Sequence, residues 1–234
     1  MPDYLNMIAA LGIAGAHPGG LQLTKQFLPA MDLPFPCRIL DAGCGTGQTL
    51  SYLSALGYSP SGIDSDQRMV RKARERLGES AAVQQGKLEQ MPYPGSHFDA
   101  VFSESVLSFT DTSAALKECR RVLVPGGKLG AVEVILEQPL HSASRNEIMD
   151  FYGFKALLSE KEWQNLFGSC GYCEVRSLKA EEFSFTYDDE QPDHELMMDE
   201  SVPPEVFDVY QAHQLILQKY SGYLSYRAFI AARC

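Results

Sequence analysis

The chain has 234 residues, of which 45% are hydrophobic, and it carries a formal net charge of -10 at pH 7. A chain of this length buries roughly 70–75% of the surface that its unfolded form exposes, so we expect one sizeable core without disulfide or metal staples. The acidic balance argues against a nucleic-acid partner, because nucleic-acid binders neutralise phosphates with clustered Lys and Arg.

The first feature along the chain is an apolar run from Leu5 to Ala16. It is too short to span a bilayer, and Asp3 stands where a signal peptide needs Lys or Arg. We therefore predict an N-terminal helix, within a helical segment 1–35, in a cytoplasmic protein without a membrane span. The next motif, His17-Pro18-Gly19-Gly20, is either a lid with free backbone donors or a turn between two helices.

Beta-branched and aliphatic runs then alternate with helical patterns through the first two-thirds of the chain. Strands are predicted at Arg38–Ala42, Pro60–Ile63, Ala81–Gln85, Phe98–Phe102 and Lys128–Ile135. Helices are predicted at Gln48–Leu56, Asp66–Leu77 and Ser113–Leu123, and the basic residues of the second helix are expected to form a solvated face. The alternation favours an α/β fold with a doubly wound, mostly parallel sheet that helices cover on both faces.

The last third contains two helical patterns from Asn146 onward, one of them at Glu160–Gly168, and strand-like runs at Glu174–Leu178 and Tyr223–Ala231. Trp163 is expected in the core. Between the two runs lies an insertion, 180–218, without Lys or Arg. Its acids are Glu181, Glu182, Asp188, Asp189, Glu190, Asp193, Glu195, Asp199, Glu200, Glu205 and Asp208. The insertion is either a solvated surface segment or a substrate cover that suits an apolar or cationic small molecule. With no repeat or long linker, 1–234 reads as a single domain.

Six cysteines are scattered without the framework of a secreted domain, so we expect reduced thiols. Cys170 and Cys173 form a lone CxxC, which supplies half of a zinc site at best. No metal site is predicted.

The stretch Leu40-Asp41-Ala42-Gly43-Cys44-Gly45-Thr46-Gly47 is the most informative: an apolar strand delivers an acid, then three alternate glycines, then a helix. Glycine there lets the backbone approach a ligand that a side chain would exclude. A dinucleotide fingerprint would place its third glycine at position 48, where Gln48 stands. This weakens an NAD(P)-dependent oxidoreductase interpretation, and a glycine-rich turn without a ligand is a further alternative.

Asp64 adds a second signal, because it closes the second predicted strand about 20 residues past the glycine turn. A carboxylate at that position can accept hydrogen bonds from both ribose hydroxyls, so the spacing indicates an adenosine-containing ligand. Hydrogen bonds to a charged group contribute about 1.5–3 kcal/mol each. As an alternative, Asp64 caps the helix that starts near Asp66.

Five motifs occur in one order between Ile39 and Val134. They are Asp41-Ala42-Gly43-Cys44-Gly45-Thr46-Gly47, Gly62-Ile63-Asp64, Met91-Pro92-Tyr93, Phe98-Asp99-Ala100-Val101 and Leu123-Val124-Pro125-Gly126-Gly127. In these motifs the chain resembles class I S-adenosylmethionine-dependent methyltransferases, especially the subgroup that includes ubiquinone and menaquinone biosynthesis methyltransferases. The resemblance implies a Rossmann-like sheet of about seven strands with the last strand reversed, and S-adenosylmethionine as cofactor.

The resemblance also implies the cofactor contacts. Gly43, Cys44, Gly45 and Gly47 would wrap the methionine end, Asp41 would lie near its amino group, and Asp64 would bind the ribose. Ser65 and Met69 would flank the adenine, and Ser103 would face the cofactor from the other side. Where the family usually has an aspartate for the adenine amino group, this sequence has Lys87. Leu88 would then supply a backbone donor, and Glu89 the replacement acceptor.

The cofactor's sulfonium already makes its methyl group electrophilic, so positioning is the protein's main task, and positioning can contribute roughly 7–11 kcal/mol. A base is needed only if the acceptor must lose a proton. His17, Glu104 and His141 are the candidate bases. We expect in-line methyl transfer to a small-molecule acceptor. The alternatives are a non-catalytic S-adenosylmethionine-binding protein and, with less support, an NAD(P)-dependent oxidoreductase.

Overall fold

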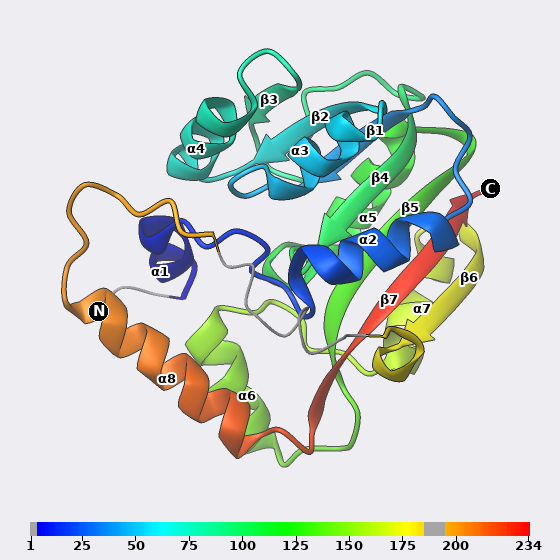
Figure 1. Cartoon of the computed structure of the whole chain (residues 1–234). Helices are drawn as coiled ribbons and strands as arrows, with labels where there is room; N and C mark the ends of the chain where they lie inside the picture. Colours follow the sequence, from blue (N-terminus) through cyan, green and yellow to red (C-terminus); the bar gives the residue numbers. More distant parts are fainter. Residues whose placement is uncertain (1–3, 185–194) are drawn as a thin grey trace.

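The computed structural model describes residues 4–184 and 195–234. Within these ranges seven strands form one sheet in the order β3-β2-β1-β4-β5-β7-β6 (Figure 1). They are β1 (Arg38–Ala42), β2 (Ser59–Asp64), β3 (Ala82–Gln85), β4 (Phe98–Glu104), β5 (Leu123–Leu136), β6 (Tyr172–Lys179) and β7 (Leu224–Arg233). β7 runs antiparallel to β5 and β6, and the other paired strands are parallel. The predicted doubly wound α/β sheet with a reversed last strand is confirmed.

Helices cover both faces of this sheet, which is why its central strands are apolar on both sides. One face packs against α2 (Gly20–Ala30), α3 (Gln48–Ala55) and α4 (Gln67–Leu77), and the other against α5 (Thr112–Val122) and α7 (Glu160–Ser169). Trp163 of α7 is fully buried against Phe229 of β7, as expected for a core residue. β5 begins at Leu123 rather than at Lys128, because α5 ends at Val122 and the Pro-Gly-Gly stretch continues the strand with a shifted register against β4.

A third group of helices lies beyond the carboxyl ends of the parallel strands (Figure 1). It consists of α1 (Tyr4–Leu11), α6 (Ser142–Tyr152) and α8 (Glu205–Lys219), joined by two apolar clusters. The predicted helix Leu5–Ala16 ends earlier, at Leu11, because Gly12 takes a left-handed conformation and Ile13 pairs with Leu196. The sequence predicted no helix at α8, whose first turn carries Glu205 and Asp208, a favourable place for acids.

The acidic insertion is tied to α4 by ion pairs. Lys72 donates to the carbonyl of Ala9 at 2.5 Å and pairs with Asp199 at 2.8 Å, and Arg76 pairs with Glu195 at 2.6 Å. Lys72 is buried, so the expectation that the basic residues of this helix form a solvated face is wrong at that position. Asp199 therefore pairs with a buried lysine, and Glu195 pairs with Arg76 from the surface. The acids Asp188, Asp189, Glu190 and Asp193 lie outside the described residues.

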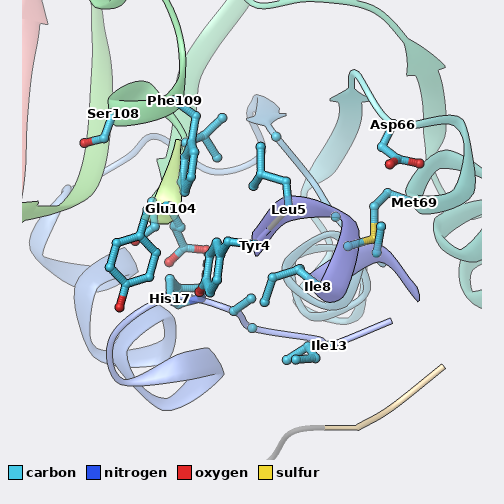
Figure 2. Close-up of a pocket in the computed structure, with 18 of the residues that line it drawn as sticks. Tyr4, Leu5, Ile8, Ile13, His17, Asp66, Met69, Glu104, Ser108 and Phe109 are labelled. Carbon is cyan, nitrogen blue, oxygen red and sulfur yellow. Dashed lines mark ion pairs between the residues drawn. The ribbon is translucent and has the colours of Figure 1, made fainter. Parts of the chain in front are cut away.

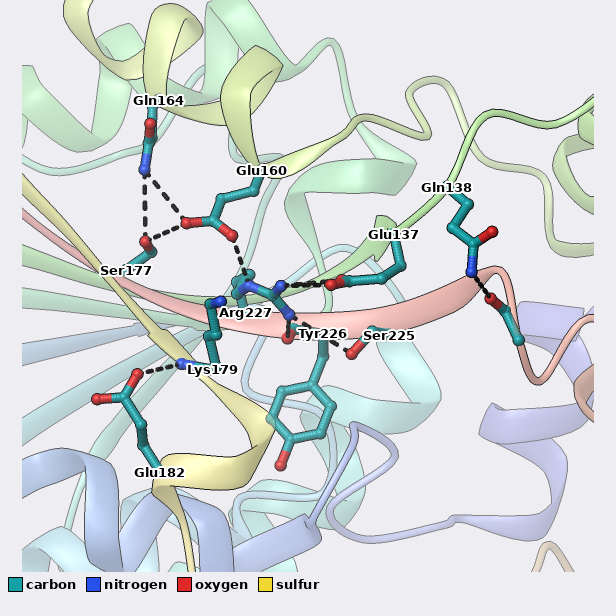
Figure 3. Close-up of polar contacts among 11 residues, drawn as sticks. Glu137, Gln138, Glu160, Gln164, Ser177, Lys179, Glu182, Ser225, Tyr226 and Arg227 are labelled. Atoms are coloured by element: carbon teal, nitrogen blue, oxygen red, sulfur yellow. Dashed lines mark hydrogen bonds and ion pairs between the residues drawn. The ribbon is translucent and has the colours of Figure 1, made fainter.

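The strands that flank the insertion are fixed by Arg227 of β7 (Figure 3). Its guanidinium, nearly buried, pairs with Glu137 beyond β5 at 2.8 Å and with Glu160 of α7 at 2.7 Å. Glu160 also accepts from the Ser177 hydroxyl of β6 at 2.5 Å. This network fastens α7, β6 and β7 to one another where the chain leaves and rejoins the sheet.

Cys173 and Cys234 are joined by a disulfide, so the expectation of reduced thiols is wrong for this pair. The start of β6 lies beside the end of β7, since Cys173 pairs with Ala232, and Cys234 directly follows β7. Cys170 is a free, buried thiol beside Ser113, so the CxxC does not act as a unit. The described residues contain no cluster of three metal-ligating side chains, and none of their helices has the length and apolarity to cross a bilayer.

Candidate active site

A cavity of about 1230 Å³ opens at the carboxyl ends of β1, β2 and β4, where a doubly wound sheet binds its ligands. Its walls come from the turns after these strands, from β5 and from the helices α1, α6 and α8. All the predicted cofactor residues line it except Gly47 and Ser103. In Figure 2, Asp66 and Met69 lie on one side and Ser108 and Phe109 on the other, with Tyr4, Leu5 and Ile8 of α1 between them.

The glycine turn after β1 performs two different tasks. Gly45 has a φ of 52°, and a Cβ there would meet no atom within 4 Å, because the position faces the open cavity. Gly47 has a φ of 78° and caps α3; a Cβ there would lie 3.0 Å from Leu77 and 3.1 Å from Ala73 of α4. Gly47 thus permits close helix packing, while Gly45 brings backbone to the ligand.

Three carboxylates repel one another where the cavity meets the carboxyl ends of β1, β2 and β4. They are Asp41, Asp64 and Glu104. Asp41 is buried, and its Oδ2 lacks a hydrogen-bond partner among the described residues. Burial, together with the charges of Glu104 and Asp64, raises the pKa of Asp41 well above its usual range. An unpaired buried acid beside a cavity is a place for a cationic group of a ligand, such as the ammonium and sulfonium of S-adenosylmethionine.

Asp64 accepts from the N–H of Gly45 at 3.0 Å and from the N–H of Asp66 at 2.8 Å. Burial raises its pKa. The backbone of Ser65 also donates to this carboxylate. A carboxylate has about four acceptor positions, so Asp64 keeps capacity to accept from the ribose. The side chain that caps α4 is Asp66, which accepts from the N–H of Arg68 at 2.7 Å, so the capping alternative for Asp64 is wrong.

Glu104 is held at the tip of β4 by two hydroxyls, Thr24 at 2.7 Å and Thr49 at 2.9 Å. His17 Nε2 lies 3.7 Å from its Oε2, and both side chains are almost buried. The His17-Pro18 motif therefore joins the cavity wall from the segment between α1 and α2. His141, the third candidate base, lies outside the cavity lining: it caps α6 by accepting from the N–H of Ala143.

The predicted adenine region is formed by Ser65, Met69 and the turn 87–89. The Leu88 side chain is buried in the core, and the structure gives its N–H no partner among the described residues, so this donor is available. Glu89 is engaged elsewhere, since it accepts from the N–H of Asp111 at 3.1 Å. Ser103 is fully buried within β4, because alternate residues of a strand face opposite sides, and its neighbour Glu104 points to the cavity instead.

The far half of the cavity is aromatic. Tyr4 stacks on Phe109 with ring centroids 6.3 Å apart and meets Tyr152 edge-on at 4.8 Å. Phe154, Phe207, Tyr210 and Tyr226 complete this wall. Burial raises the pKa of Tyr4 to about 12, which keeps its phenol neutral. This half suits a ligand with an apolar or aromatic body.

Two polar residues in this half were missed by sequence analysis. Glu133 of β5 accepts from the Ser108 hydroxyl at 2.7 Å and from the N–H groups of Val106, Leu107 and Ser108 at 3.1, 2.9 and 3.3 Å. Burial outweighs these bonds and raises its pKa to about 7. A lone acid in an otherwise apolar strand was a usable signal. His213 of α8 had none, because its Nδ1 meets Tyr152 Oη, at 3.0 Å, only through the packing of α8 on α6.

Comparisons with known proteins agree with this geometry. A family model described as a methyltransferase domain matches residues 40–131. The chain is 40% identical over 240 residues to the uncharacterized methyltransferase YodH of Bacillus subtilis (strain 168), and this match covers 99% of each chain. It is 32% identical over 129 residues to the ubiquinone/menaquinone biosynthesis C-methyltransferase UbiE of Shewanella sp. (strain W3-18-1), across 51% of this chain and 50% of that relative.

Among solved structures, phosphoethanolamine N-methyltransferase 2 of Haemonchus contortus in complex with S-adenosyl-L-methionine has a TM-score of 0.75 at 19% identity, over 93% of this chain and 53% of that one. That likeness concerns the fold. The full-length relative, the domain match, the strand order and the acid-lined glycine turn lead to one conclusion: the chain belongs to the class I S-adenosylmethionine-dependent methyltransferases.

Proposed function

We propose that this protein transfers the methyl group of S-adenosylmethionine to a small-molecule acceptor that lies in the aromatic half of the cavity. The observation that carries the proposal is the continuity of one cavity of about 1230 Å³ with two chemically different halves. Pockets for a single small ligand usually span about 300–1,000 Å³, so this one has room for two. Holding two ligands side by side in one cavity turns a reaction between two molecules into an effectively unimolecular step.

In this proposal the cofactor occupies the acid-lined half. Asp64 accepts from the ribose hydroxyls, Asp41 neutralises the amino group, and the 43–45 turn brings backbone against the methionine part. The adenine lies between Met69 and the Leu88 N–H. When bound, S-adenosylmethionine supplies a methyl group that its sulfonium has made electrophilic. The protein's own contribution is then to align the acceptor and exclude water.

We assign the cover to the N-terminal segment 1–35 and the insertion 180–218, both within a single domain 1–234. Among their described residues, α1 and α8 place Tyr4, Ile8, Phe207 and Tyr210 on the cavity. The described lining contains no Arg, and its Lys residues are Lys87 and Lys155. This composition favours an acceptor with an apolar body over a phosphorylated one, and the net charge of -10 favours a small molecule over nucleic acid.

Calorimetric titration with S-adenosylmethionine, S-adenosylhomocysteine and NAD tests the cofactor assignment. Asp64→Ala removes the ribose acceptor, and the loss of one or two charged hydrogen bonds, about 1.5–3 kcal/mol each, weakens binding tenfold or more. Asp99→Ala is the matched control, since Asp99 lies at the opposite end of the same sheet, where it accepts from Arg38. Thermal unfolding of both variants separates lost binding from lost folding.

The outcomes distinguish the alternatives. Binding of both adenosyl ligands that Asp64→Ala abolishes and Asp99→Ala leaves unchanged supports the assignment. Tight binding without production of S-adenosylhomocysteine from any acceptor in a broad panel favours a non-catalytic binding protein. NAD binding in place of S-adenosylmethionine overturns the proposal in favour of an oxidoreductase.

A further inference from the structure

The aromatic half of the cavity contains one basic nitrogen held in a fixed orientation. His213 lies on the face of α8 that lines the cavity, together with Tyr210, Gln214 and Leu217. Its Nδ1 lies 3.0 Å from Tyr152 Oη of α6, and the ring packs 5.2 Å from Tyr4 of α1. Among the described residues, Nε2 has no hydrogen-bond partner. The ring is thus fixed by one nitrogen and free at the other.

Two other titratable groups of the lining, Glu133 and Glu104, are occupied by hydrogen bonds from the protein. The two oxygens of Glu133 offer about four acceptor positions, and four donors fill them. Glu104 accepts from Thr24 and Thr49 on the cofactor side of the cavity. His213 is the imidazole of the aromatic half, and its Nε2 has a lone pair for an acceptor proton.

We propose that His213 is the general base of the methyl transfer, oriented by Tyr152, and that the acceptor is an aromatic hydroxyl compound, a phenol or a fused-ring analogue. The inference rests on the proposed function. An acceptor ring packed against Tyr4 would place its hydroxyl within reach of His213, because the two rings line the same cavity with centroids 5.2 Å apart. Nδ1–H then donates to Tyr152 Oη, which leaves the lone pair on Nε2.

The acceptor O–H bond breaks and its proton goes to His213 Nε2. The electron pair left on oxygen forms the new bond to the methyl carbon, while the carbon–sulfur bond breaks and its pair stays on sulfur. The imidazolium later returns the proton to solvent. Neutral His213 is the starting state, and burial lowers its pKa below 6.5.

The surroundings of the ring agree with a neutral base. The titratable groups that face it are Tyr4 from α1, Tyr152 from α6 and Tyr210 from α8. No carboxylate pairs with it among the described residues, so none raises its pKa or consumes its lone pair. Lys155 and Glu133 are the charged or acidic groups on the same half of the lining.

The first test determines the protonation of His213 directly and requires no methyl transfer. Nitrogen NMR of the labelled protein, with the signal assigned by its loss in His213→Gln, reports which ring nitrogen carries the proton. We expect a lone pair at Nε2 at neutral pH and a shift of this nitrogen when 4-chlorophenol is added to the complex with S-adenosylhomocysteine. His141 is the internal control and should not respond. A proton on Nε2 in the complex, or no shift on saturation, overturns the proposal.

The second test uses phenol, 4-chlorophenol and 4-nitrophenol, which differ little in size but increase in acidity. Loss of a general base costs about 10²–10⁴-fold in kcat. We expect His213→Gln to lose that factor with phenol and much less with 4-nitrophenol, which ionises unaided. Tyr152→Phe keeps the ring packing, and its smaller loss should follow the same order. His141→Gln should behave as wild type.

Each further outcome decides a different point. Equal losses for the three phenols mean that His213 has a structural role, and they overturn the base assignment. No methyl transfer to any phenol, with S-adenosylmethionine binding intact, overturns the acceptor class and leaves the proposed function standing. Absence of S-adenosylmethionine binding contradicts the proposed function itself.

Discussion

The buried acid Glu133 makes the stability of this fold depend on pH with a definite sign. Its pKa is raised from an ordinary 4.5 to about 7 in the folded protein, because burial opposes the charged form. The folded state therefore binds this proton more tightly than the unfolded chain does. The resulting stabilisation is fully present below about pH 4.5 and is lost as pH rises through about 7. At 1.36 kcal/mol per pH unit, it amounts to about 3 kcal/mol.

Glu133→Gln is the perturbation that isolates this contribution, because glutamine matches the protonated acid in shape and charge and does not titrate. Urea unfolding of both proteins from about pH 5 to about pH 8 gives two stability curves. The free energy of unfolding of the wild type should fall relative to the variant by up to about 3 kcal/mol over that range. Asp41 and Asp64 titrate in both proteins and cancel in the difference. A constant difference, or one that grows in favour of the wild type with pH, would refute the reasoning.

Two further substitutions have matched controls in the chain. Lys72→Met leaves the Ala9 carbonyl and Asp199 without their buried partner, so it should lower the free energy of unfolding by about 2–3 kcal/mol in the same urea experiment. Arg71→Met removes an exposed partner of the same Asp199 and should change the free energy of unfolding by under about 0.5 kcal/mol. Gly45→Ala should weaken S-adenosylmethionine binding tenfold or more by calorimetry, because its Cβ enters the cavity. Gly78→Ala also adds a Cβ at a positive φ with open surroundings, but away from the cavity, so it should leave binding unchanged.

The sheet and the cofactor half were predictable because their signals are local. The buried run Arg38–Ala42 is β1 as predicted, and the glycine turn and Asp64 follow directly after the strands that place them. A strand, its turn and the next helix are specified within about 20 residues, so periodicity and spacing are sufficient to position them. Such spacing does not decide which face of a strand a side chain takes: the structure places the Ser103 side chain in the core and its neighbour Glu104 on the cavity.

The arrangement of α1, α6 and α8 over the cavity could not be predicted in the same way, because contacts between residues far apart in the sequence position these helices. Lys72 has the sequence pattern of a solvated face, yet α1 and Asp199 bury it from two other parts of the chain. α8 lies in a stretch whose acids obscured its helical pattern. His213 gains its fixed orientation from Tyr152, which is 61 positions away in the sequence. Pairing at such separations depends on the finished fold.

The shared family domain contains some of the residues on the cavity wall and leaves out others. The matching family model ends at residue 131, after the glycine turn, Asp64 and Glu104, and before Glu133, Tyr152 and His213. The segment it covers supplies the acid-lined half of the cavity and Phe109 of the aromatic half, and α1, α6 and α8 supply Tyr4, Tyr152, Phe207, Tyr210 and His213. Under the proposed function, acceptor selection would therefore depend largely on residues outside the shared domain, whose positions depend on helix packing. The Lys72–Asp199 pair holds the segment that leads into α8, and α8 carries His213, so loosening that pair should impair acceptor turnover more than cofactor binding.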